Sequence, residues 1–186
     1  MKHNRFVQLS WVLLALMTLA SAAWTQARAT APSGTIVETL RQDLVRFQKL
    51  EVAKEEGYGL FHGCMSSPQS GAMGVHFVNG DLVGDGEVDA LHPEALLYQP
   101  KDGKMQLVGV EYLVFAEAWD ANHEGPPMVM GHMFNFTSAP NRLRIPAFYS
   151  LHVWAWQSNP SGTFSDFNPK VSCDGYISDA AMDAHH

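Results

Sequence analysis

Three apolar, strand-like runs in this chain each carry one polar, ligand-capable side chain in their middle, and this feature limits how the chain can fold. The polar residues are His76 in the run 71–79, Glu111 in the run 110–114 and His152 in the run 151–154. A buried polar group without a partner costs about 1–3 kcal/mol of folding free energy. A fold that buries these runs must therefore pair the three groups with one another or with a shared ion.

The three side chains form a metal-ligand set of a known type. Two imidazoles and one carboxylate are the donors of non-haem iron sites and of some zinc sites. We expect His76, Glu111 and His152 to lie on separate strands and to point into a barrel-like pocket that holds a transition metal, namely iron, zinc or copper. The chain would then be a metal-dependent protein, and an enzyme is one form of it. The sequence identifies no reaction or substrate.

Residue alternation supports this arrangement only in part. His152 shares a strand face with Phe148 and Trp154. Regular alternation would also place Glu111 on the face of Leu107, but both faces of that run are apolar, so alternation alone leaves the direction of Glu111 open.

The alternative is that the same residues are structural. His76 and His152 would then be hydrogen-bonded core histidines, and Glu111 would form an ion pair with Arg142 or Arg144. The chain also lacks the closely spaced His-x-His pair that is typical of cupin metal sites.

A second set of donors predicts copper handling. Met130 and His132 lie close together in a methionine-rich stretch, and His62 lies in another stretch of soft donors. Thioether and imidazole groups suit copper(I). The competing interpretation is a methionine-lined apolar pocket, because methionine is a flexible core filler.

Aromatic side chains near the predicted site favour a third function, a metal-free binding module for an apolar small molecule. Ligand pockets are mostly apolar and aromatic with a few polar groups. The same side chains could equally form an ordinary core. The predicted pocket residues are Tyr112, Phe115, Phe148, Trp154 and Trp156.

The first 29 residues have the features of a secretory signal peptide, with a basic start, an apolar stretch and a cleavage site between Ala23 and Ala29. Cleavage would take the formal charge from −7 to −10. A charge of this sign argues against nucleic acid and against anionic membranes as partners, and leaves a metal ion or a small molecule. We therefore expect a periplasmic or secreted protein with no membrane attachment after cleavage.

The two cysteines, Cys64 and Cys173, predict one disulfide in an exported protein. The competing interpretation makes Cys64 a thiolate metal ligand, because His62 and Met65 lie beside it.

The remaining pattern predicts an α+β fold in a single domain, residues 30–180, followed by a mobile tail, 181–186. One amphipathic N-terminal helix, Thr35–Glu56, begins with the capping box of Thr35 and Glu38. It would pack on a mainly antiparallel sheet that closes toward a small β-barrel. An Asp-Gly turn at 101–104 predicts a hairpin, and the acidic segment 79–89 predicts a solvated loop. The predicted strands are Gly74–Val78, Ala95–Gln99, Met105–Phe115, Val129–Phe136 and Phe148–Trp156.

Several stretches together resemble a group of exported, uncharacterised bacterial proteins. They are GAMGVHFVN at 71–79, PEALLY at 93–98, VEY at 110–112, LHVW at 151–154 and NPSG at 159–162, with SC at 172–173. The resemblance covers most of the mature chain and implies export and one compact domain. It implies no activity, cofactor or substrate.

Overall fold

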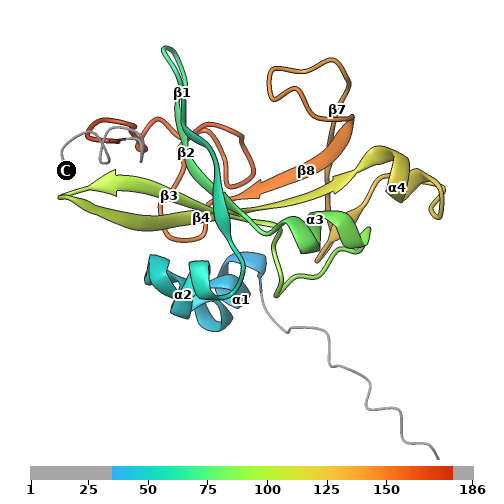
Figure 1. Cartoon of the computed structure of the whole chain (residues 1–186), viewed down its shortest axis with the longest axis horizontal. Coiled ribbons are helices and arrows are strands. Elements are labelled where there is room, and N and C mark those ends of the chain that lie inside the picture. The colour runs from blue at the N-terminus through green and yellow to red at the C-terminus, as the bar shows by residue number, and fades with distance from the viewer. Residues whose placement is uncertain (1–34, 178–186) are drawn as a thin grey trace, which may run out of the picture. The chain divides into compact units, whose positions relative to one another are not determined.

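The computed structural model describes residues 35–177, which form an α+β structure around one strongly curled antiparallel sheet (Figure 1). The sheet has six strands in the order β1-β2-β3-β4-β8-β7. In the described part of the chain, β1 and β7 are its free edges, so it is a half-barrel and not a closed barrel. The strands are β1 (Gly59–Ser67), β2 (Gly71–Val78), β3 (Ala95–Lys101), β4 (Lys104–Phe115), β7 (Asn135–Thr137) and β8 (Phe148–Val153).

The N-terminal helical segment packs on one face of this sheet, but it is not one helix as predicted. It consists of α1 (Ile36–Asp43), the 3-10 turn η1 (Val45–Gln48) and α2 (Leu50–Glu55). The break frees the carbonyl of Phe47, which accepts a hydrogen bond from the Tyr98 hydroxyl at 2.6 Å. A helical pattern cannot reveal this tertiary contact, because the partner lies on β3.

Other features of the predicted helix are confirmed. Thr35 and Glu38 form the reciprocal capping box at its start. The predicted apolar stripe faces the sheet, with Ile36, Leu40 and Leu44 almost fully buried. This stripe joins residues of β2, β3, β4 and β8 in the main core, so the helical layer and one face of the sheet hold the fold together.

Alternation divides the sheet residues between two faces. Val75, Leu96, Val110 and Leu151 belong to the core under the helices. The residues next to them in sequence, which include His76, Leu97, Glu111 and His152, therefore lie on the opposite face. The segments 138–147 and 158–173 supply side chains on that opposite side.

Some local predictions differ from the structure. Val129–Phe136 is not one strand: β5 (Met128–Val129) and β6 (His132–Met133) form a small hairpin, because Met130 and Gly131 turn the chain with φ of 46° and 83°. Part of the predicted acidic loop is a short helix, α3 (Gly80–Asp85), whose first turn is capped by Asn79. The prediction omitted β1, and α4 (Ala116–Asp120) follows β4.

Two further predictions are confirmed. The hairpin between β3 and β4 turns at Asp102 and Gly103, both with positive φ. Cys64 and Cys173 form a disulfide that ties β1 to the C-terminal segment, so Cys64 is not a thiolate ligand.

Between residues 35 and 177, no helix is long and apolar enough to cross a membrane. The predicted signal peptide, its cleavage site and the predicted tail at 181–186 lie outside the described residues.

Candidate metal centre

Three different strands bring His76, Glu111 and His152 together on the face of the sheet opposite the helices. His76 lies on β2, Glu111 on β4 and His152 on β8. Glu111 and His152 are direct cross-strand partners. On β3, which lies between β2 and β4, the residue opposite Glu111 is Ala95, whose methyl side chain leaves room for the carboxylate to reach toward β2.

A bulge in β4 decides the direction of Glu111. Leu97 pairs with Gly109 and Tyr98 pairs with Leu107, so one extra residue, Val108, interrupts the register. The expectation that Glu111 and Leu107 share a face is therefore wrong: Leu107 packs in the core under the helices. Without the bulge, regular alternation would put Leu107 and Glu111 on the same face of the sheet.

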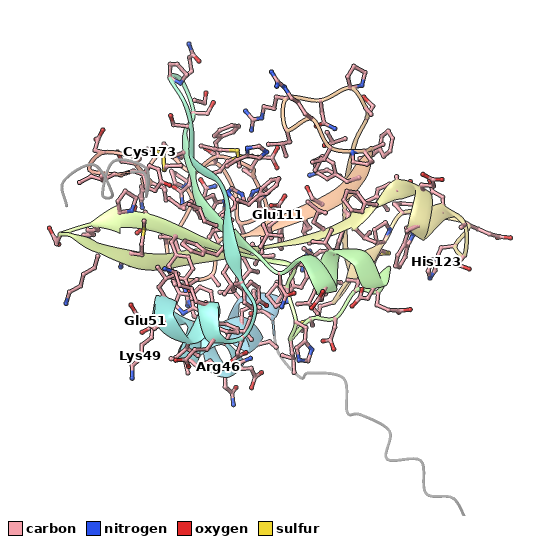
Figure 2. All side chains as sticks on the ribbon, in the orientation of Figure 1. Arg46, Lys49, Glu51, Glu111, His123 and Cys173 are labelled. Atoms are coloured by element: carbon pink, nitrogen blue, oxygen red, sulfur yellow. A yellow bond between two sulfur atoms is a disulfide. The ribbon has the colours of Figure 1, made fainter. Side chains whose placement is uncertain are left out.

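The donor atoms of the three side chains converge. His76 Nε2 lies 3.4 Å from Glu111 Oε2, and His152 Nδ1 lies 3.7 Å from Glu111 Oε1. One ligand atom from each residue lies within 4.8 Å of the other two. Figure 2 shows Glu111 in the middle of the sheet. The arrangement is thus one carboxylate with an imidazole at each oxygen.

The cluster is buried and short of hydrogen bonds. His76, Glu111 and His152 are 2%, 7% and 3% exposed. Among the described residues, His76 Nδ1 and both ring nitrogens of His152 have no hydrogen-bond partner. Buried polar atoms are nearly always bonded in folded proteins, so atoms without a partner call for a specific explanation. A bound ion would supply one for His152 Nδ1, the one of these three atoms that faces Glu111.

Burial and mutual charge set the protonation of the cluster. Burial lowers the pKa of His76 to about 3, with a smaller contribution from neighbouring His152, so this imidazole is neutral and offers its lone pair. Burial also raises the pKa of Glu111. For His152, burial acts to lower the pKa, but the carboxylates of Glu111 and Asp166 outweigh it and the pKa is raised.

The cluster forms part of the wall of a cavity of about 270 Å³. Much of the remaining wall is apolar and comes from β1, β2, β4, β8 and two loops. Its apolar members include Phe61, Met65, Met73, Leu113, Phe148 and Phe167. The cavity therefore combines a small group of metal donors with an apolar surface, which is the usual composition of a small-molecule site.

Sequence reasoning missed one charged residue of this cavity, Asp166, and expected a different partner for another, Arg142. Asp166 lies on the segment after β8, and its Oδ1 is 3.5 Å from His152 Nδ1. The His152 ring holds the pKa of Asp166 below its ordinary value. Arg142, considered as an ion-pair partner of Glu111, instead donates a hydrogen bond from Nη2 to Met73 Sδ at 3.2 Å. Neither residue belongs to a periodic run, so the sequence pattern did not place either of them in the cavity.

The weaker metal candidates lie elsewhere. His62 is exposed with a φ of 56°, and its ring contacts Phe61 with 4.2 Å between centroids. His132 contacts Phe164 at the same centroid distance. Met130 packs beside the main core. These three donors do not assemble with the His/Glu cluster.

The predicted aromatic residues do not line one pocket. Phe148 lines the cavity beside the His/Glu cluster, whereas Trp156 lines a separate hollow. Tyr112 lies in the core under the helices and donates a hydrogen bond to the Ala90 carbonyl at 2.7 Å. Trp154 Nε1 donates to the Ser165 carbonyl at 2.6 Å, and Phe115 is half-buried.

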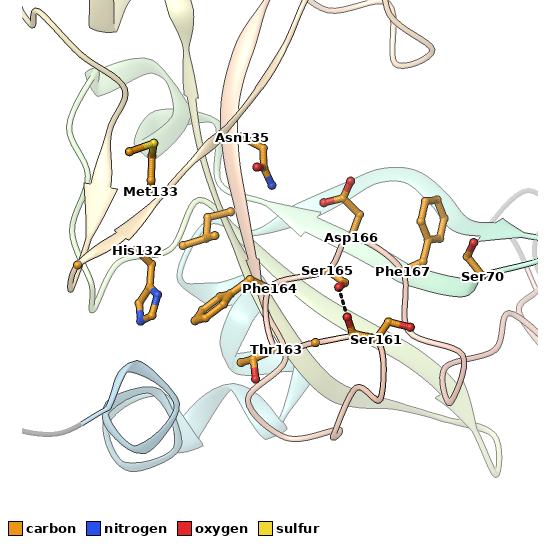
Figure 3. A pocket seen from close by; sticks show the side chains of 13 residues that line it. Ser70, His132, Met133, Asn135, Ser161, Thr163, Phe164, Ser165, Asp166 and Phe167 are labelled. Carbon is orange, nitrogen blue, oxygen red and sulfur yellow. Dashed lines mark hydrogen bonds between the residues drawn. The ribbon is translucent and has the colours of Figure 1, made fainter.

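Figure 3 shows a second hollow, which shares wall residues with the cavity of the His/Glu cluster. It has a volume of about 800 Å³, and His132 and Phe164 contribute to its wall. Asp166 and Phe167 line both this hollow and the cavity of the cluster.

Comparisons with known proteins identify no relative. No protein-family model matches the chain. No curated protein and no solved structure matches it either.

Proposed function

We propose that this protein is an exported metal-binding protein that holds a divalent transition metal with His76, Glu111 and His152. One observation carries the proposal: two buried imidazoles meet the two oxygens of one buried carboxylate, while three ring nitrogens have no hydrogen bond. Ligation through His76 Nε2 and His152 Nδ1, the nitrogens that face Glu111, would give His152 Nδ1 a partner and neutralise the carboxylate.

The distances suit such a metal. Bonds of about 2.0–2.2 Å at tetrahedral angles separate two ligand atoms by about 3.4 Å. The two nitrogen–oxygen distances around Glu111 are 3.4 and 3.7 Å. The three donor atoms lie within 4.8 Å of one another, so the widest pair would have to close by up to about 1.4 Å to reach the tetrahedral separation around one ion.

The ligand types favour zinc or iron. Imidazole with carboxylate suits Zn²⁺ and Fe²⁺, whereas Mg²⁺ and Ca²⁺ prefer oxygen ligands alone. Three protein ligands leave coordination positions open toward the cavity, as in catalytic and not structural sites. The bound ion would act there as a Lewis acid or activate a water molecule. The proposed function is therefore that of a metal-dependent enzyme for a small molecule.

Specific observations also support two alternatives, copper as the bound ion and an apolar ligand bound without metal. The thioether side chains of Met65 and Met73 line the same cavity as the two histidines, which favours copper as the ion. The apolar wall near Phe148 and Phe167 would also suit an apolar ligand bound without metal.

The disulfide between Cys64 and Cys173 supports an oxidising location, the periplasm or the exterior. The signal-like start of the sequence supports the same location.

Elemental analysis of protein purified without an affinity tag tests the proposal. The chain ends in His185 and His186, so both are replaced by alanine to remove adventitious binding. We expect about one metal ion per chain by the ligand set, and loss of that ion in Glu111→Gln, which keeps the size of the side chain and removes its charge. Glu87→Gln, a change at an exposed carboxylate, is the matched control. Equal metal content in the two variants would reject the site.

A further inference from the structure

Arg142 places a guanidinium on the cavity wall without a carboxylate partner. Its Nη2 donates to Met73 Sδ, and its Cζ lies 5.3 Å from the ring centroid of Phe167. Both neighbours also line the cavity. Within residues 35–177, the ion pairs shorter than 4.0 Å involve other cations. The guanidinium thus meets one weak acceptor and one aromatic face, and most of its five N–H donors remain available.

The loop that presents Arg142 is held by the side chain of Asn141. Asn141 Oδ1 accepts from the backbone N–H groups of Leu143 at 3.2 Å and Ile145 at 3.4 Å. Its Nδ2 donates to the carbonyls of Ser138 at 3.2 Å and Ile145 at 2.9 Å. These bonds restrict the backbone on both sides of Arg142, so less conformational entropy is lost when the guanidinium binds a ligand.

Among the described residues, no acidic side chain forms an ion pair within 4.0 Å with this guanidinium, although its charge contributes to the lowered pKa of Asp166. Glu111 is engaged by the two histidines, and Asp166 Oδ1 lies 3.5 Å from His152 Nδ1. Arg142 is the one lysine or arginine among the described residues that line the cavity. Its planar fork of N–H groups matches the two oxygens of a carboxylate.

The size and the wall of the cavity limit the rest of such a ligand. A dry cavity of about 150 Å³ holds benzene, and this cavity measures about 270 Å³. Leu113, Phe148 and Phe167 provide apolar surface. The space therefore suits one ring, or a short aliphatic chain, that carries a small polar group.

We propose that the cavity binds a small monocarboxylate with an apolar body, and that Arg142 pairs with its carboxylate while the body lies against Phe148 and Phe167. The proposal rests on the proposed function for the role of the metal, because such a ligand would lie beside His76, Glu111 and His152. It names the substrate class of that site. Carboxylate binding itself needs only Arg142 and the apolar wall, so it can be measured with and without metal.

Calorimetric titration with benzoate and its neutral analogue benzamide tests this inference. The variants are Arg142→Gln and Arg144→Gln. Arg142 and Arg144 are both exposed and lie on the same loop, but only Arg142 lines the cavity, so Arg144 is the matched control. We expect one benzoate per chain in the wild type and in Arg144→Gln. We expect binding weaker by about tenfold or more for benzoate in Arg142→Gln and for benzamide in the wild type, because a charge-assisted pair is lost.

The titrations are made on metal-free and on zinc-loaded protein, with zinc stoichiometry measured for each variant. Suppose that all variants bind zinc. If benzoate then does not bind, or binds equally to Arg142→Gln and Arg144→Gln, the carboxylate site is overturned and the metal site stands. Benzoate binding that depends on Arg142 in a protein without zinc affinity would support the carboxylate site and reject the metal. Arg142→Lys, which keeps the charge and loses the fork, should retain part of the affinity if Arg142→Gln does not fold.

Discussion

His76 Nε2 and Glu111 Oε2 lie 3.4 Å apart although their strands, β2 and β4, are not neighbours in the sheet. Neighbouring strands are about 4.8 Å apart, so two side chains must reach across β3 to meet. Ala95, opposite Glu111 on β3, leaves the space that this contact needs. The buried pair is therefore a product of the strand order and of one small residue.

Replacement of His152 by alanine should remove stoichiometric metal binding. We expect the metal affinity to fall by more than about 100-fold, because even the loss of an outer-sphere partner costs about 10–100-fold. The metal-free protein should still fold, since the disulfide and the helical layer lie elsewhere. His92→Ala, a change at an exposed histidine, is the control. Unchanged metal content with a stability loss of about 1–4 kcal/mol would instead make His152 a structural histidine.

Glu94 should make stability fall as pH rises. The side chain is 2% exposed and accepts a hydrogen bond from the Leu113 N–H at 2.9 Å, and burial raises its pKa from 4.5 to about 8. Between these values the folded protein keeps a proton that the unfolded chain has released. The free energy of unfolding should therefore decrease across this range, by at most about 1.4 kcal/mol per pH unit.

Glu94→Gln isolates this contribution, because the amide cannot ionise and still offers an acceptor oxygen to Leu113. We measure the free energy of unfolding of both proteins in urea from pH 5 to pH 9. Relative to the wild type, that of the variant should rise by about 1–4 kcal/mol in total across this range. Glu87→Gln, at an exposed site, should follow the wild type. A constant difference between Glu94→Gln and the wild type across this range would contradict the raised pKa.

Reduction of the disulfide should destabilise the protein. Cys64 and Cys173 are separated by 109 positions, and closing a loop of that length contributes roughly 4–5 kcal/mol in the chain-entropy model, often less in practice. Urea unfolding with and without reductant measures the loss, and the Cys64→Ser/Cys173→Ser variant should show no effect of reductant. Two free thiols in oxidised, exported protein, detected by alkylation and mass spectrometry, would contradict the bridge.

Tyr98→Phe should destabilise the fold where the N-terminal helical segment breaks. The change removes the hydroxyl that bonds the Phe47 carbonyl and leaves that buried acceptor unpaired, at a cost of about 1–3 kcal/mol. Tyr149→Phe is the control, because its hydroxyl bonds the exposed carboxylate of Asp120. Thermal unfolding of both variants measures the difference, and equal melting temperatures would show that the Phe47 carbonyl finds another partner.

Local sequence signals predicted a substantial part of this fold. The capping box of Thr35 and Glu38, the positive-φ turn at Asp102 and Gly103, and the alternating runs around His76 and His152 all act within a few residues. The physics of such signals is local, so the sequence is sufficient to state them. The three candidate ligands were identifiable for a related reason: a polar side chain in an apolar run needs a partner in any fold that buries it.

The sequence by itself determined which groups had to find partners, and the tertiary structure alone decided which partners they found. The bulge at Val108 places Glu111 on the face of the histidines, and the Tyr98 hydroxyl donates a hydrogen bond to the Phe47 carbonyl. Loops without periodicity brought Asp166 and Arg142 to the same cavity. These outcomes depend on strand order, register and loop closure between distant residues, and such non-local contacts leave no repeating pattern in the chain that makes them.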